Sequence, residues 1–168
     1  MRFFQGDAMI FRQAEENEVV ALNKLAFEAQ AYWGFDEEYM ARFAEVFVMG
    51  ENYLDNHTVF VTIRDNKISG FFSVEENEVN ELDFFYVRRD MIGRGVGREM
   101  WHYMLGLCRQ KGIKELHWVT SPCAKPFYIK LGAEQVGTTR SIVDNNLIIP
   151  RLRYCLEPEK NERGSKPE

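Results

Sequence analysis

Apolar and polar residues recur along the chain with two spacings, one typical of helices and one of strands. Residues 9–13 have the character of a first strand, and apolar positions at helical spacing then predict a helix over residues 19–32. Gly34 interrupts this helix, and Asp36 is suited to cap the next one. The expected buried stripe of that second helix consists of Tyr39, Met40, Phe43, Val46 and Phe47.

The middle of the chain alternates as strands do. Residues 58–64 and 68–74 predict a hairpin closed by Asp65-Asn66, and residues 81–87 predict another strand. A helix containing Met100, Trp101 and Met104 follows and should end near Gly112. The strand expected at 114–120 should run parallel to strand 81–87, because a strand–helix–strand unit forms a crossover.

The last elements are a short helix and two strands. Ser121 and Pro122 predict the helix start, as N-cap and first helical residue, and the helix should end at Gly132. Strands are expected at 133–142 and 147–156, joined by a turn at 144–146. The pattern predicts an α+β domain over residues 1–156, with about seven mostly antiparallel strands, one parallel pair and about four helices. The polar tail at 157–168 is expected to be disordered.

Composition narrows the class of protein. Apolar residues make up 45% of the chain, enough for a hydrophobic core, and the net charge of −5 disfavours a general nucleic-acid binder. Cys108, Cys123 and Cys155 form no CxxC pair, and the three histidines lack metal-ligand spacing, so we expect no metal. The N-terminal residues lack the continuous apolar segment of a signal peptide, and no apolar run is long enough to span a bilayer. A cytoplasmic protein without membrane partners is expected.

The strand at 81–87 leads into a glycine-rich loop, IGRGVG, at residues 92–97. Backbone amides in such a loop, together with a helix N-terminus, can bind an anion such as phosphate. The glycines at 93, 95 and 97 do not fit the dinucleotide motif GxGxxG, and no Lys-Ser or Lys-Thr follows as in a nucleotide-triphosphate loop. A turn that only packs the strand against the helix is the structural alternative.

The loop resembles the coenzyme A loop of the GNAT acetyltransferase superfamily, Gln/Arg-x-x-Gly-x-Gly/Ala. Gly95 and Gly97 match its last two positions, whereas Ile92 replaces the leading Gln or Arg. The resemblance implies that loop amides hold the pyrophosphate of acetyl-CoA and that the strand end at Val87 pairs with its pantetheine arm. The cofactor-binding residues implied around the loop and strand end are Phe85, Tyr86, Val87, Ile92, Gly93, Arg94, Gly95, Val96, Gly97 and Arg98. Arg88 and Arg89 could also reach phosphate, or form only a solvated basic patch.

A second stretch, SPCAKPFYIKLGA, resembles the GNAT segment NxxAxxFYxKxGF. Ser121 replaces the usual Asn and Ala133 the aromatic residue, while Tyr128 keeps the family tyrosine. The resemblance implies that Tyr128 protonates the departing thiolate, and a phenol pKa of about 10 is within reach of a thiol near 8.5. Further cofactor-binding positions implied here are Ser121, Ala124, Phe127 and Lys130.

The acceptor amine must lose a proton, and the strand at 81–87 offers two carboxylates. Alternation predicts that Glu81, Asp83, Phe85 and Val87 share one face. Glu81 lies six residues before Val87, where the histone-modifying branch of the family carries its catalytic glutamate. Glu81 or Asp83 is therefore a candidate base, directly or through water, although either could simply face solvent or pair with an arginine.

The aromatic stretch at residues 31–35 joins the first two helices. Tyr32, Trp33 and Phe35 either pack in the core or line the acceptor pocket, as this connection does in the GNAT fold. The expected activity is acetyl transfer from acetyl-CoA to a small-molecule or peptide amine, in a ternary complex. A coenzyme A-binding regulator and a transferase of longer acyl groups are the alternatives. The resemblance also allows a homodimer, because family members often dimerise, but no feature of the sequence indicates one.

Overall fold

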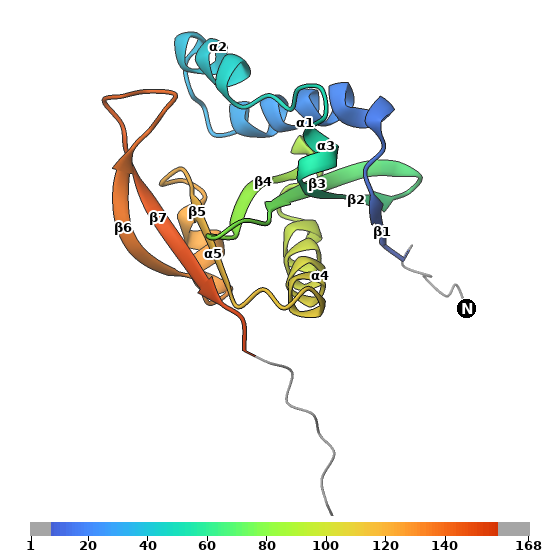
Figure 1. Ribbon diagram of the computed structural model, residues 1–168. Coiled ribbons are helices and arrows are strands. Elements are labelled where there is room, and N and C mark those ends of the chain that lie inside the picture. Colours follow the sequence, from blue (N-terminus) through green and yellow to red (C-terminus); the bar gives the residue numbers. More distant parts are fainter. Residues whose placement is uncertain (1–7, 158–168) are drawn as a thin grey trace, which may run out of the picture.

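The protein, described here from a computed structural model over residues 8–157, is built on a seven-stranded sheet in the order β1-β2-β3-β4-β5-β7-β6 (Figure 1). Each pair of neighbouring strands is antiparallel except β4 and β5, which are parallel. This arrangement confirms the predicted α+β class. The strands are β1 (Ile10–Gln13), β2 (Thr58–Arg64), β3 (Lys67–Glu75), β4 (Glu81–Val87), β5 (Glu115–Val119), β6 (Glu134–Arg140) and β7 (Ile148–Cys155).

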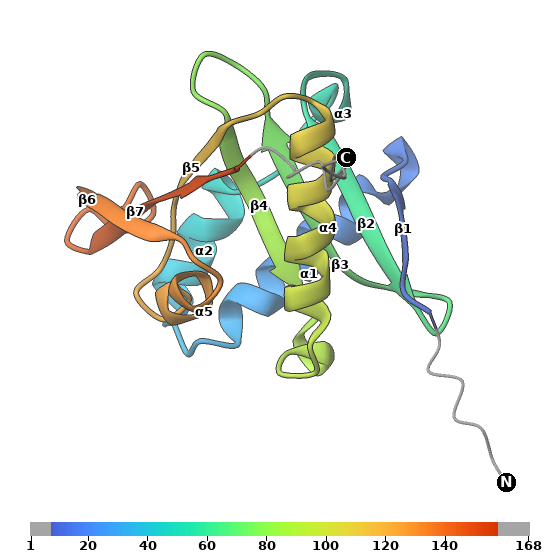
Figure 2. The ribbon, with the colours of Figure 1, turned by 90° about the horizontal axis from the view of Figure 1, so that it is seen from below.

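Helices cover both faces of the sheet (Figures 1 and 2). On one face lie α1 (Val19–Ala31), α2 (Glu37–Val46) and α3 (Tyr53–Asn56); on the other lie α4 (Val96–Gln110) and α5 (Lys125–Lys130). Short 3-10 turns, η1 (Glu16–Glu18) and η2 (Arg89–Met91), precede α1 and follow β4. The predicted tail lies outside the described residues except for Glu157.

Two local predictions are confirmed, namely the cap of α2 and the turn between β2 and β3. The Asp36 carboxylate accepts a hydrogen bond of 2.8 Å from the Tyr39 amide and so caps α2. Asp65 and Asn66 close the β2–β3 hairpin with φ values of 52° and 60°, as the primed turns of tight hairpins require.

The core is divided by the sheet. Beneath it, Met100, Trp101 and Met104 of α4 pack on Phe72 and Leu116 of the sheet. Above it, Leu22 and Ala26 of α1 pack on Phe71 and Phe84. The two faces are therefore anchored independently, and β4 contributes to both.

Three details differ from the sequence prediction. The short helix α5 begins at Lys125 rather than Pro122, because a turn capped by the Ser121 hydroxyl, 3.3 Å from the Ala124 amide, comes first. The four-residue helix α3 was not predicted, because it is too short to show a period. Val46, expected in the buried stripe of α2, is 41% exposed at the last position of the helix.

A β-bulge in β4 changes which side chains share a face. Phe84 pairs with Ser73 and Leu82 pairs with Val74, so Asp83 is an extra residue between them. The prediction that Asp83 shares a face with Phe85 is therefore wrong. The bulge places Asp83 on the α1–α3 side, where it meets Tyr53, whereas Phe85 packs toward α4 and α5.

Candidate functional site

The parallel strands β4 and β5 touch at one end and diverge. Their register consists of Glu81 opposite His117, supported by a 3.0 Å hydrogen bond from the His117 amide to the Asn80 carbonyl. Beyond this point β4 and β5 no longer pair, and β5 stays paired along its other edge with β7. A cavity of about 440 Å³ lies where the strands separate, at their carboxyl ends, which is where ligands bind in many α/β sheets.

The glycine-rich loop forms one end of this cavity. Gly93 and Gly95 have φ values of +81° and +82°, which residues with a side chain rarely adopt. Gly95 precedes α4 without a side-chain cap, so the first amides of α4 lack acceptors within the helix. A Cβ on Gly97 would lie 3.2 Å from Cζ of Phe127, so this position holds α4 tightly against α5. The loop thus combines a helix N-terminus with backbone turned as an anion nest.

Most of the predicted cofactor-binding residues border this cavity. Those that line it are Phe85, Tyr86, Val87, Ile92, Gly93, Gly95, Gly97, Arg98, Ser121, Ala124 and Phe127. Arg94 and Lys130 are exposed and do not line it, and Val96 is buried in the core behind the loop. Arg98 is accordingly the arginine best placed for a phosphate.

Arg88, also considered for phosphate binding, has other partners. Its guanidinium lies 2.6 Å from the Asp90 carboxylate and 3.3 Å from the Ile68 carbonyl. The guanidinium lowers the pKa of Asp90, which stays ionised as its partner. Arg88 therefore closes the turn after β4 rather than reaching into the cavity.

Tyr128 lies on α5 in the wall between the two ends of the cavity. Its ring is buried among Phe127, Trp118, Trp101 and Phe85, with centroid separations of 5.1 to 5.9 Å. Burial raises the pKa of its phenol, so the hydroxyl keeps its proton near neutrality. No described residue accepts a hydrogen bond from this hydroxyl, which leaves the proton available to a ligand.

The end of the cavity beneath α1 and α2 contains a chain of neutral hydrogen-bonding groups. The Tyr86 hydroxyl donates to Oε1 of Gln30 at 3.3 Å, and Nε2 of Gln30 donates to the Tyr39 hydroxyl at 3.1 Å. Burial raises the pKa of both tyrosines, so they remain uncharged. Gln30 was not predicted as a site residue; a polar residue on the otherwise apolar buried stripe of α1 was the available signal.

The aromatic stretch between α1 and α2 is only partly in the cavity wall. Trp33 lines the cavity, whereas Tyr32 packs edge-on against Trp33 with ring centroids 5.2 Å apart. Phe35 stacks on Tyr39 at 4.0 Å and so supports the wall from behind. The structure adds Tyr39 and Phe47, which the sequence suggested only as core residues.

The two candidate carboxylates have different positions. Asp83 lines the large cavity and also a neighbouring one of about 200 Å³, whereas Glu81 lines only the smaller one, with His117 and Arg151. The two cavities share five wall residues: Phe47, Leu82, Asp83, Trp118 and Val119. Asp83 therefore lies where the cavities adjoin.

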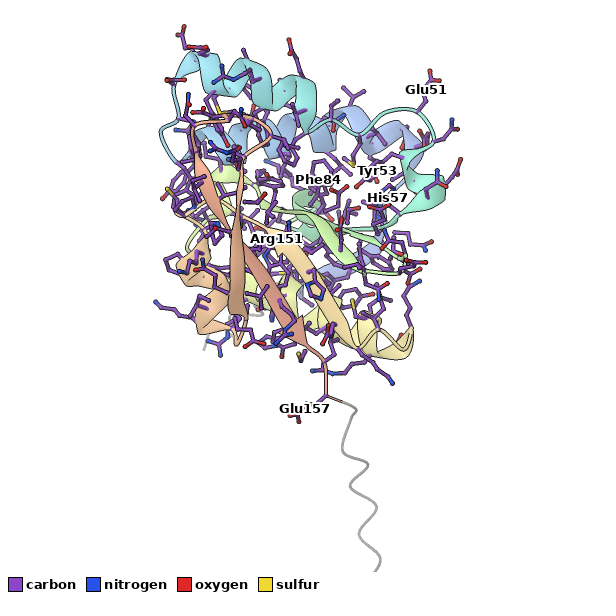
Figure 3. The ribbon with its side chains drawn as sticks, turned by 60° about the vertical axis from the view of Figure 1, so that its left-hand side comes forward. Glu51, Tyr53, His57, Phe84, Arg151 and Glu157 are labelled. Carbon is purple, nitrogen blue, oxygen red and sulfur yellow. The ribbon has the colours of Figure 1, made fainter. Side chains whose placement is uncertain are left out.

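A polar cluster surrounds Asp83 on the α3 side of β4. The Tyr53 hydroxyl donates to Oδ2 of Asp83 and lies 2.7 Å from the Ser73 hydroxyl. His57 stacks on the Tyr53 ring, and both side chains lie near Phe84 between the upper helices and the sheet (Figure 3). Burial and the Asp83 carboxylate raise the pKa of Tyr53, so it stays a donor. No local sequence signal indicates this cluster, because its members come from α3 and its C-cap, from β3 and from β4.

The walls suit the coenzyme A that the resemblance implies. The amide nest and the Arg98 guanidinium can bind phosphate groups, and the separated edge of β4 has unpaired backbone groups. The Tyr128 hydroxyl in the cavity wall can donate a proton. Within residues 8–157, no group of three or more His, Cys, Asp or Glu side chains is placed to hold a metal ion. None of the helices in the same part of the chain is both long and apolar enough to cross a bilayer.

Comparisons with known proteins agree with this geometry. A family model described as "Acetyltransferase (GNAT) domain" matches residues 23–148. A search of curated protein sequences gives no significant match.

Solved structures share the fold at low sequence identity. PaiA N-acetyltransferase from Thermoplasma acidophilum, in complex with coenzyme A, is 16% identical with a TM-score of 0.71, covering 88% of this chain and 99% of its own. A GCN5-related N-acetyltransferase from Rhodopseudomonas palustris is 16% identical with a TM-score of 0.75, covering 93% and 99%. A GNAT acetyltransferase from Staphylococcus aureus is 15% identical with a TM-score of 0.66, covering 89% and 100%. The match over residues 23–148, on this fold and around this cavity, means that the chain belongs to the GNAT acetyltransferase family.

Proposed function

We propose that the protein transfers the acetyl group of acetyl-CoA to a primary amine, by direct attack in a ternary complex. The observation that carries this proposal is one continuous cavity with an amide nest at one end, the buried Tyr128 hydroxyl in its wall and the Asp83 carboxylate beside it. The T. acidophilum neighbour, solved in complex with coenzyme A, supports the assignment of the nest to the coenzyme.

Different groups along the cavity bind the phosphates, bind the pantetheine arm and assist the chemical step. The amides at the start of α4 and the Arg98 guanidinium bind the phosphates, and the free edge of β4 near Val87 pairs with the pantetheine arm. A backbone amide near Val87 polarises the thioester carbonyl. The amine nitrogen forms its bond to the carbonyl carbon as the bond to sulfur breaks, and Tyr128 protonates the sulfur.

Asp83 is better placed than Glu81 to take a proton from the amine. Both face the smaller cavity, but only Asp83 also borders the cavity that contains Tyr128. Glu81 is exposed beside His117 and Arg151, where it can attract a cationic acceptor on its way in. The candidate base of the proposed reaction is therefore Asp83, acting directly or through a water molecule.

The lining also suggests the class of acceptor. The walls beneath α1 and α2 are aromatic or neutral, and Asp83 and Arg98 are the charged residues among the described cavity-lining residues. Because Arg98 lies at the loop end, an acceptor carboxylate would have no cation to meet near Trp33, Tyr39 and Phe47. A compact amine with an apolar or planar body fits best.

Thiol release from acetyl-CoA, measured over a panel of amines, tests this proposal. The panel should include arylalkylamines, the corresponding α-amino acids and short peptides. We expect turnover with arylalkylamines and at least tenfold lower kcat/KM when an α-carboxylate is added, a difference of about 1.4 kcal/mol. Calorimetric binding of coenzyme A without turnover on any amine would instead favour the non-catalytic regulator, and turnover only with longer acyl thioesters would favour the other alternative.

A further inference from the structure

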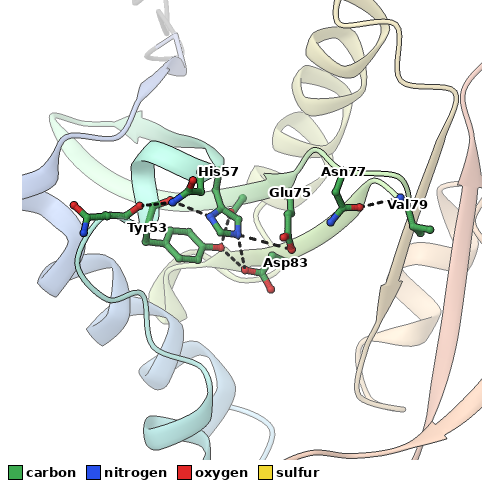
Figure 4. A network of polar contacts seen from close by, with 9 residues as sticks. Tyr53, His57, Glu75, Asn77, Val79 and Asp83 are labelled. Carbon is green, nitrogen blue, oxygen red and sulfur yellow. Dashed lines mark hydrogen bonds and ion pairs between the residues drawn. The ribbon is translucent and has the colours of Figure 1, made fainter.

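The ring of His57 has its Nε2 side turned toward two carboxylates of the sheet (Figure 4). Its Nδ1 is 2.9 Å from the Tyr53 carbonyl oxygen, and because a carbonyl can only accept, Nδ1 carries a hydrogen. The other nitrogen, Nε2, is then the one that can gain or lose a proton. It lies 3.9 Å from Oδ2 of Asp83 and 3.9 Å from Oε2 of Glu75.

The three groups lead from the cavity to the surface. Asp83 lines both cavities with a side chain that is 34% exposed, the His57 side chain is 15% exposed, and the Glu75 side chain is 40% exposed. When an acceptor fills the cavities beside Asp83, one imidazole nitrogen and one accessible carboxylate still lead from Asp83 to solvent. The 3.9 Å separations exceed a hydrogen bond, so each transfer needs a small closure or one bridging water.

Tyr53 holds this arrangement in place. Its ring stacks on His57 with centroids 3.8 Å apart, and its hydroxyl donates to Asp83. The same hydroxyl lies 2.7 Å from Oγ of Ser73, which fixes it against β3. One side chain thus fixes both the imidazole and the carboxylate. The bulge in β4 is what turns Asp83 toward this side of the sheet.

The proposed reaction releases one proton to solvent in each turnover. An ammonium acceptor carries three N–H hydrogens and the amide product carries one, so two protons leave the nitrogen. One ends on the coenzyme sulfur through Tyr128, and the other must reach solvent. Within the described residues, Asp83 has no arginine or lysine partner that would fix it as a permanent anion.

We infer that His57 relays this second proton, from Asp83 to Glu75 and on to solvent, and that Tyr53 is the positioning residue for the relay. The inference rests on the proposed amine acetylation. Asp83 takes the proton from the ammonium, Nε2 of His57 takes it from Asp83, and Glu75 receives it from the same nitrogen. Each step moves one proton, and the relay returns to its starting state after each turnover.

The test replaces His57 by Gln and by Ala in the full-length protein and measures steady-state thiol release. General acid–base groups contribute roughly 10²–10⁴-fold, and water can partly substitute, so we expect His57→Gln to lower kcat by about 10- to 100-fold. Coenzyme A binding, measured by calorimetry, should stay within about twofold, because His57 does not line the cavity that contains the nest. Added imidazole and its methyl derivatives should restore part of the rate of His57→Ala, in the order of their basicity.

His102→Gln provides the matched control, because His102 is exposed on α4 and lines neither cavity. It should keep the wild-type kcat and show no response to imidazole. Should the His57 variants fold poorly, Glu75→Gln tests the same path from its exposed end, with an expected several-fold loss of kcat and unchanged coenzyme affinity.

Two results would overturn the relay. One is a wild-type rate in His57→Gln and Glu75→Gln; the other is a loss in His57→Ala that no imidazole restores, which would indicate a structural role. If the wild-type protein acetylates no amine, the proposed function fails first, and that failure is distinct from either result.

Discussion

Replacing Tyr128 by Phe removes one oxygen atom and separates its chemical role from its packing role. The ring remains among Trp118, Trp101 and Phe127, so the aromatic contacts are preserved. The hydroxyl donates to no described residue, so its loss leaves no protein acceptor unsatisfied. We expect the free energy of unfolding to change by less than about 1 kcal/mol at pH 7.

The rate should respond differently. A positioned general acid contributes roughly 10²–10⁴-fold, so kcat for acetyl transfer should fall by that factor, equivalent to about 3–5 kcal/mol in activation free energy. Because the proton is lost only as the sulfur departs, the affinity for coenzyme A should stay nearly constant. A large kinetic effect with a small effect on stability is the signature of a catalytic acid.

The raised pKa of Tyr128 adds a dependence on pH. An unfolded tyrosine ionises near pH 10, whereas burial keeps Tyr128 neutral in the folded state at that pH. Stability is therefore fully present below about pH 10 and is lost above it, by up to about 1.4 kcal/mol per pH unit for this group. Tyr128→Phe should show a shallower loss of stability above pH 10 than the wild-type protein.

Thiol release, calorimetric binding of coenzyme A and urea unfolding at pH 7 and above pH 10 make up the assay. Tyr103→Phe is the control, because Tyr103 stacks on Phe11 away from the cavity and should leave kcat unchanged. A Tyr128→Phe variant that keeps kcat within about threefold of wild type would refute the assignment of the acid.

Further predictions concern stability and coenzyme binding. A Cβ on Gly70 would lie 2.7 Å from the Tyr86 carbonyl oxygen, so Gly70→Ala should lower the free energy of unfolding by about 1–3 kcal/mol, whereas Gly106→Ala, in open space within α4, should raise it by about 0.5–1 kcal/mol. Equal effects in urea unfolding would contradict this. Asp36→Ala removes the cap of α2 and should cost about 1 kcal/mol in the same assay, with no change if the cap is dispensable. Arg98→Ala should weaken coenzyme A binding about tenfold by calorimetry and leave the affinity for pantetheine, which has no phosphate, unchanged. An equal loss of affinity for both ligands would show that Arg98 does not bind a phosphate.

The sequence predicted the scaffold well because its signals are local. Residues 65–66 act through their own backbone geometry, Asp36 acts through a side-chain cap three residues along the chain, and the loop has a conformation that glycine permits. The residues that the GNAT resemblance implies for coenzyme binding could therefore be named from the sequence, and most of them line the cavity.

The cavity wall formed with α1 and α2 was not predictable in the same way, because it depends on packing between distant segments. Gln30, Tyr39 and Tyr86 come from α1, α2 and β4 and meet only after the helices dock on the sheet. The bulge at Asp83 breaks the strict alternation of side chains from which we predicted that Asp83 and Phe85 share a face. No residue type in this strand indicates a bulge. His57 looked isolated because its partners lie 18 and 26 residues away.

The separation of β4 from β5 has a consequence for how the protein unfolds. Strands β1–β4 hydrogen-bond as one group and β5–β7 as another, and backbone contact between the groups is confined to the end near Glu81. A ligand that pairs with the free edge of β4 would supply the cross-links that the sheet itself lacks. If coenzyme A binds there as proposed and also contacts β5, its occupancy would raise the cooperativity with which the two groups of strands unfold.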